Sequence, residues 1–85
     1  MITRVGIVSI IVEKDASTKE LNDILHEYSS YIIGRMGVPY REREINLISV
    51  AMDAPQDAFS ALSGKIGKLK GVSAKTVLSN VVSDE

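Results

Sequence analysis

The most constraining feature of this sequence is a pair of short segments that are apolar on both alternating faces of a β-strand. The first is residues 4–12, RVGIVSIIV, and the second is residues 45–52, INLISVAM. In the first, apolar side chains stand at odd and at even positions: Val5, Ile7 and Ile11, and Val8, Ile10 and Val12. Successive side chains of a strand point to opposite faces, so a sheet built on these segments must cover both of its faces.

Two amphipathic helices are predicted around these strands. The sequence Ser17-Thr18-Lys19-Glu20 has the form of a capping box, and the apolar stripe behind it consists of Leu21, Ile24, Leu25 and Tyr28. For the second helix, Asp53 or Ala54 would be the cap, Pro55 would lie in the first turn, and Gly71 would end the helix. Its apolar face would consist of Ala58, Phe59, Leu62, Ile66 and Leu69.

The other extended segments have weaker signals. Residues 31–39 contain two glycines and end in a proline, which predicts an edge strand or a bulge. Charged residues 41–44 would connect this strand to the next, antiparallel one. Residues 72–78 would form the last strand, and residues 79–85 a frayed tail.

The predicted order is therefore β-α-β-β-α-β in a single domain of residues 1–85. This α+β arrangement is the ferredoxin-like sandwich, in which right-handed crossovers place both helices on one face of an antiparallel sheet. The second apolar face would then form an exposed patch larger than monomers usually carry. We expect a homodimer or homotetramer that forms through the sheets, or alternatively a sheet that closes like a barrel.

Composition narrows the classes of protein. A chain of 85 residues without cysteine has a small core and no disulfide to support it, which also favours assembly. The net charge of −1 disfavours a direct nucleic-acid binder, and no apolar run is long enough to span a membrane. Because the chain has neither cysteine nor a recognisable signal peptide, we expect a cytoplasmic protein.

Few residues in the sequence point to metal binding, catalysis or ligand binding. His26 is the single histidine, so one chain cannot form an ordinary transition-metal site, and we expect His26 to be a solvated surface residue. No nucleophile stands at a recognised spacing from a base, so we expect neither enzymatic activity nor a cofactor. Arg35, close to Gly37, either presents its guanidinium to an anionic ligand or is an edge-strand charge that opposes aggregation.

Two segments, RMGVP at residues 35–39 and ALSGKIGKLKGVSAKTV at residues 61–77, make this chain similar to iron-only hydrogenase system regulators. The likeness extends from the first strand to Val77. It implies an ACT-like fold, similar to the C-terminal domain of nickel-responsive repressors, that senses a small molecule or assembles with other copies. ACT domains that bind amino acids usually have a glycine in the loop after the first strand. The matching positions here are Asp15, Ala16 and Ser17, without a glycine.

The resemblance also sets limits. Nickel-responsive repressors use several histidines and a cysteine, so nickel sensing does not carry over to this chain. No residues remain for their DNA-reading domain, so a transcriptional role would need a separate DNA-binding or maturation protein. We predict a non-enzymatic oligomeric regulator with ligand contacts at Asp15, Ala16, Ser17, Arg35 and Gly37. The alternative is a structural interaction module without a ligand, and a small ferredoxin-like enzyme has the least support.

Overall fold

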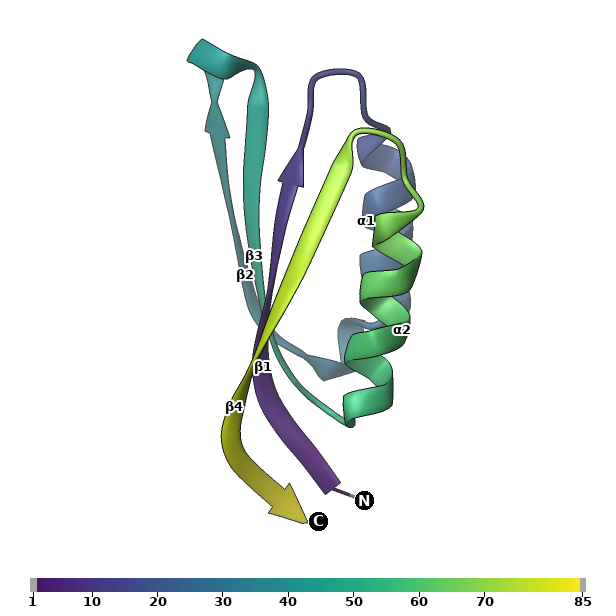
Figure 1. Cartoon of the computed structure of the whole chain (residues 1–85), viewed down its shortest axis with the longest axis vertical. Helices are drawn as coiled ribbons and strands as arrows, with labels where there is room; N and C mark the ends of the chain where they lie inside the picture. The colour runs from purple at the N-terminus through teal and green to yellow at the C-terminus, as the bar shows by residue number, and fades with distance from the viewer. Residues whose placement is uncertain (1, 85) are drawn as a thin grey trace.

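The computed structural model describes the backbone of residues 2–84 and the side chains of residues 2–80. Its elements are β1 (Ile2–Val12), α1 (Thr18–Glu27), β2 (Ile32–Tyr40), β3 (Ile45–Ala54), α2 (Gln56–Gly67) and β4 (Val72–Asp84), with 3₁₀ turns at Ser29–Tyr31 and Arg41–Arg43. The strands form one antiparallel sheet in the order β2-β3-β1-β4, and both helices lie on one side of it (Figure 1). The predicted α+β, ferredoxin-like fold is confirmed. Within residues 2–84, neither helix is long and apolar enough to cross a bilayer.

Helix α1 begins where its sequence predicts. The Ser17 hydroxyl accepts a hydrogen bond from the Glu20 backbone N–H at 3.3 Å, which satisfies one of the free donors of the first turn. Leu21 and Leu25 are buried, and the predicted apolar stripe faces the sheet. The polar side of the helix carries an ion pair between Lys19 and Asp23 at 2.9 Å.

The predicted ends of α2 were wrong. Strand β3 continues to Ala54, which pairs with Arg4 of β1, so the backbone is still extended there and the helix cap is Pro55. At the other end the helix stops at Gly67, four residues before Gly71. Gly71 has a φ of +76° and its carbonyl accepts the Glu13 N–H at 2.7 Å, so this glycine forms the turn into β4.

The two edge strands differ from the central ones. In β2 the register shifts between Ile32 and Gly34, which confirms the predicted edge strand with a bulge. Strand β4 is longer than predicted, because residues 79–84 continue the strand in place of a frayed tail. Pairing of Ile2 with Asp84 and of Arg4 with Val82 accounts for the extension, since β1 itself begins two residues earlier than predicted.

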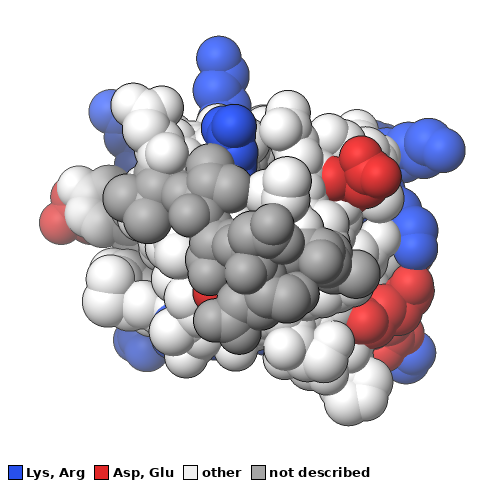
Figure 2. Space-filling model, turned by 90° about the horizontal axis from the view of Figure 1, so that it is seen from below, with Lys and Arg blue, Asp and Glu red and all other residues white. Residues whose placement is uncertain are grey.

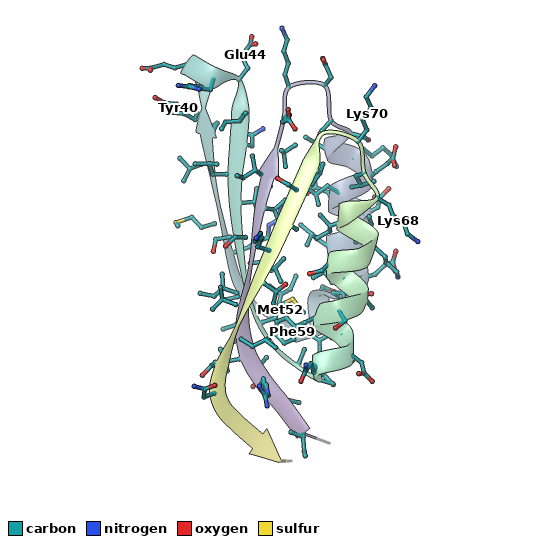
Figure 3. All side chains as sticks on the ribbon, in the orientation of Figure 1. Tyr40, Glu44, Met52, Phe59, Lys68 and Lys70 are labelled. Atoms are coloured by element: carbon teal, nitrogen blue, oxygen red, sulfur yellow. The ribbon has the colours of Figure 1, made fainter. Side chains whose placement is uncertain are left out.

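The core lies between the helices and the inner face of the sheet, by which we mean the face toward the helices. Met52 of β3 and Phe59 of α2 meet there (Figure 3). Gly6 lies in the same layer, opposite Met52 and Leu78. A Cβ on Gly6 would stand 2.8 Å from Leu78 Cδ2 and 2.9 Å from Phe59 Cε1, so the close approach of the ring requires a glycine.

The outer face of the sheet, opposite the helices, is also apolar. Its large side chains are 40% to 67% exposed: Val5, Ile7, Ile11, Met36, Val38, Tyr40, Leu47 and Val77. The sheet is open, with β2 and β4 as its two edges, so the barrel-like alternative was wrong. At the end of the molecule seen in Figure 2, Lys and Arg lie interspersed with Asp and Glu around the rim, without a continuous patch of one sign on the visible surface.

Candidate functional site

Strand β2 presents Arg35, Gly37 and Pro39 to the helix side of the sheet. Arg35 pairs with Val50, Gly37 with Ile48, and cross-strand partners point to the same face. Since Val50 belongs to the core, the alternate residues 35, 37 and 39 of β2 face inward. Residues 33–40 are nevertheless exposed, because α1 packs over the centre of the sheet and leaves this edge uncovered.

A groove follows from this offset between α1 and β2. One part, the hairpin hollow, has a volume of about 240 Å³ and lies between the β1–α1 loop and the β2–β3 turn. The other part, the central hollow, has a volume of about 270 Å³ and lies between α1 and β2. Thr18, Pro39 and Asn46 line both hollows, so the two are continuous. We call the whole feature the α1–β2 groove.

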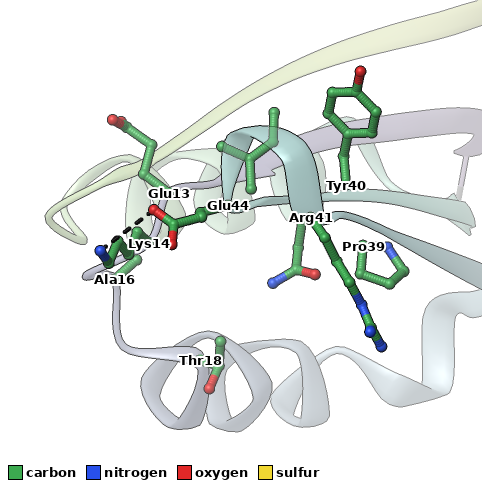
Figure 4. Close-up of a pocket in the computed structure, with 10 residues that line it drawn as sticks. Glu13, Lys14, Ala16, Thr18, Pro39, Tyr40, Arg41 and Glu44 are labelled. Atoms are coloured by element: carbon green, nitrogen blue, oxygen red, sulfur yellow. Dashed lines mark ion pairs between the residues drawn. The ribbon is translucent and has the colours of Figure 1, made fainter.

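An ion pair closes one end of the hairpin hollow. Lys14 Nζ lies 3.3 Å from Glu44 Oε2 and connects the β1–α1 loop to the β2–β3 turn (Figure 4). Glu44 has a left-handed backbone with φ of 55°. Arg41 extends toward the α1 side of the turn, whereas Tyr40 points to the opposite side (Figure 4). This end of the groove therefore contains charges of both signs.

Arg35 provides the positive charge of the central hollow. Its Nη2 donates a hydrogen bond to Asn22 Oδ1 of α1 at 3.2 Å. A guanidinium has five N–H donors in a planar fork, so this one contact leaves donors for a ligand. Leu21 and Ile48 contribute apolar side chains to the lining of the same hollow. The groove can thus take a molecule with an anionic group and an apolar part.

Three of the five predicted ligand-binding residues line this groove. Ala16 lies in the hairpin hollow, and Arg35 and Gly37 lie in the central hollow. Asp15 and Ser17 are exposed beside the groove and are not part of its lining, and Ser17 is engaged as the cap of α1.

The sequence analysis did not propose the three residues that line both hollows, Thr18, Pro39 and Asn46. The alternation of Arg35, Gly37 and Pro39 was the available signal, because it places a cationic side chain and two small residues on one face of an edge strand.

The structure also shows where the residues that could take part in metal or acid–base chemistry lie. Among residues 2–80, whose side chains are described, no group of three or more His, Cys, Asp or Glu side chains could hold a metal ion. His26 is exposed on α1, as the sequence predicts. The pKa of Lys65 is raised by its hydrogen bond to Glu27, with a further contribution from Tyr28. That pair joins α2 to α1 at 2.9 Å, away from the groove.

The family model "TM1266-like: Iron-only hydrogenase system regulator, putative" matches residues 4–76. The solved structure of the uncharacterized protein TM1266 from Thermotoga maritima is similar, with 36% sequence identity and a TM-score of 0.86, over 89% of this chain and 96% of that one. A search of curated proteins finds no match.

Two further solved structures share the fold at low sequence identity. A formyltetrahydrofolate deformylase from Pseudomonas putida has 18% identity and a TM-score of 0.66, over 91% of this chain but only 29% of that one. LarC2, the C-terminal domain of a cyclometallase involved in synthesis of the NPN cofactor of lactate racemase, has 10% identity and a TM-score of 0.50. It matches over 95% of this chain and 59% of that one. At these identities the likeness concerns the fold alone.

Proposed function

Since this chain belongs to the TM1266-like family of iron-only hydrogenase system regulators, we propose that it is a non-enzymatic regulatory domain that assembles with copies of itself and binds a small-molecule effector. Assembly would occur through the outer face of the sheet, and the effector would occupy the α1–β2 groove.

The apolar outer face is the observation that carries the assembly proposal. The molecule measures 42 × 20 × 17 Å and its long axis runs along the strands (Figure 1), so a face spanned by the long axis and either shorter axis covers roughly 700–840 Å². A standard protein interface buries about 800 Å² on each partner, so a full face-to-face contact approaches that size. Charged side chains lie toward the margins of the face, with Asp53 near the end of β3 and Lys75 on the edge strand β4. A second copy supplies a matching apolar surface, and we therefore propose a homodimer as the basic unit, from which a homotetramer could be built.

The effector proposal depends on the α1–β2 groove. Arg35 would bind an anionic group of the effector, and Gly37 provides space, because no atom lies within 4 Å of the Cβ position there. Ala16 would contact the effector at the hairpin end of the groove. Asp15 and Ser17 lie just outside the lining, and they would contact the effector only where it lies beside the β1–α1 loop. These five residues remain the proposed ligand contacts.

The cellular role would also depend on a partner. We propose that the domain acts in the cytoplasm without binding nucleic acid or membrane directly, and that a separate DNA-binding or maturation protein carries its effect to the hydrogenase system. The near-neutral charge of the chain supports this division, because binding to nucleic acid by phosphate neutralisation requires a basic surface.

Sedimentation equilibrium at micromolar concentration tests assembly. We expect the wild-type chain to be a dimer or tetramer, Ile7→Lys to shift it to the monomer, and Ala61→Lys, an exposed position on α2, to leave it unchanged. A monomeric wild type at tens of micromolar would refute assembly.

A thermal-shift screen of amino acids, nucleotides and organic acids tests effector binding, since a ligand raises the melting temperature by mass action. A hit should be lost in Gly37→Val, which fills the central hollow. Assembly without any hit would favour the alternative of an interaction module that has no ligand.

A further inference from the structure

In each half of this fold a polar contact joins the helix to the edge strand, and the strand residues of the two contacts, Arg35 and Thr76, lie in one row across the sheet with Val50 and Val8. In the first half Arg35 donates to Asn22 at 3.2 Å, and in the second half the hydroxyls of Ser63 and Thr76 lie 2.8 Å apart. Both contacts join residues 13 positions apart in the sequence. Two hydroxyls suffice to connect helix and strand in the second half, so this connection does not in itself require a guanidinium in the first.

A second hollow lies on the far side of Arg35 from the α1–β2 groove. It has a volume of about 330 Å³ and lies where α1 ends and β2 begins; we call it the His26 hollow. Its lining consists of Asn22, Leu25, His26, Ser29, Ile32 and Arg35. Leu25 and Ile32 provide an apolar floor, and the other four residues provide hydrogen-bonding groups. Arg35 and Asn22 also line the central hollow, so Arg35 stands between the two spaces.

Acidic side chains of α1 do not compete for Arg35 in this hollow. Asn22 and His26 are four residues apart on one side of α1, and Ser29 of the following 3₁₀ turn lines the same hollow. The acids of the neighbouring stripe are paired elsewhere, Asp23 with Lys19 and Glu27 with Lys65, each at 2.9 Å.

Backbone hydrogen bonds satisfy some of the carbonyl groups where α1 ends and the 3₁₀ turn begins. Carbonyl groups at a helix C-terminus disfavour an anion when they are unpaired. The carbonyls of Leu25 and Tyr28 accept the backbone N–H groups of Tyr28 and Tyr31 at 3.1 and 3.0 Å. Among the residues that line the hollow, Arg35 carries a positive charge and none is acidic.

We propose that the His26 hollow binds a small oxyanion, a carboxylate or a phosphate group, with Arg35 as the charge partner and His26 and Ser29 as additional hydrogen-bond donors. The inference rests on the proposed function in one respect: the oxyanion would be the charged end of the effector, whose remainder would occupy the α1–β2 groove beyond Arg35.

A titration of the ¹⁵N-labelled full chain tests this site. Inorganic phosphate and acetate are added separately at constant ionic strength, and amide and imidazole signals are followed by NMR. We expect saturable changes at residues 22, 26, 29 and 35 with at least one of the anions, and the stronger of the two identifies the chemistry.

Three variants make the result specific. Arg35→Gln should raise the dissociation constant by about tenfold or more, the effect expected for the loss of a charge-assisted hydrogen bond. Arg35→Lys should give an intermediate value, because it keeps the charge but loses the fork. Arg43→Gln on the β2–β3 turn removes the same charge far from the hollow and should leave binding unchanged.

Absence of saturable changes, or equal losses in Arg35→Gln and Arg43→Gln, would overturn the proposal. Gly37→Val distinguishes the effector site in the groove from the anion site in the His26 hollow. It should abolish binding of the effector in the groove and leave binding of phosphate or acetate intact. If an effector binds the wild type but not Gly37→Val, and neither anion changes the signals of residues 26 and 29, the proposal of an anion site in the His26 hollow is refuted and the proposal of an effector in the groove is not.

Discussion

Substitution of Gly6 by alanine should destabilise this fold, although it adds only one methyl group. Gly6 lies on β1 and does not have a positive φ, so its backbone alone would accept alanine. The new Cβ would stand 2.8 Å from Leu78 Cδ2 and 2.9 and 3.0 Å from two atoms of the Phe59 ring. Leu78 can move the end of its side chain, but Phe59 is only 2% exposed and is held by the core.

The size of the effect follows from two opposing contributions. Overpacking of a core costs about 1–3 kcal/mol, and replacement of glycine by alanine returns about 0.4–1 kcal/mol by restricting the unfolded chain. We expect a net loss of about 1–2 kcal/mol. Unfolding entropy of about 2.1 cal/mol/K per residue over 85 residues converts this into a melting temperature lower by roughly 5–11 °C.

Urea denaturation followed by circular dichroism, at one fixed protein concentration, measures the change. The matched control is Gly64→Ala: this helical position has no neighbour within 4 Å, so alanine should stabilise the protein by about 0.5–1 kcal/mol. Phe59→Leu removes the ring atoms that cause the clash. In that background Gly6→Ala should become nearly neutral, a coupling of about 1 kcal/mol or more. A Gly6→Ala protein as stable as wild type, or equal losses in both backgrounds, would refute the argument from close approach.

Three further predictions concern local interactions. Ser17→Ala should lose about 1 kcal/mol of stability in urea denaturation, because the Glu20 N–H loses its acceptor, whereas Ser17→Asp should retain most of it. Glu44→Gly should leave the free energy of unfolding unchanged or raise it by up to about 1 kcal/mol. Glycine adopts the left-handed backbone of this position without strain, and this gain offsets the loss of the weak, exposed ion pair with Lys14. A free energy of unfolding lower than that of the wild type would show that the ion pair matters for stability. The hydrogen bond to Glu27 raises the pKa of Lys65, so the pair stabilises the fold below the ordinary lysine pKa of 10.5. This contribution to stability is lost as pH rises through the higher pKa that Lys65 has in the folded protein. Lys65→Met should remove this part of the loss of stability at alkaline pH, as measured by thermal melts between about pH 9 and pH 12.

Local patterns in the sequence were sufficient for most of the fold. The capping box at Ser17 and the stripe of Leu21 and Leu25 depend on neighbours within one helix, so they could be read directly. The ends of α2 could not, because pairing of Ala54 with Arg4 and of Gly71 with Glu13 involves residues more than forty positions apart. For the candidate site, Arg35 and Gly37 were predicted as contacts, but their joint position with Ala16 in one groove depends on how α1 lies over the sheet.

The sequence by itself determined the order of the elements, the edge character of β2 and the presence of two apolar sheet faces. These properties follow from residue spacing and from the conformational limits of glycine and proline, which act over a few residues. Only the tertiary structure decided that the sheet stays open, that its outer face is exposed, and that α1 leaves the inner side of β2 uncovered. The physical reason is that the placement of a helix on a sheet depends on contacts such as that of Phe59 with Gly6, between segments far apart in the chain.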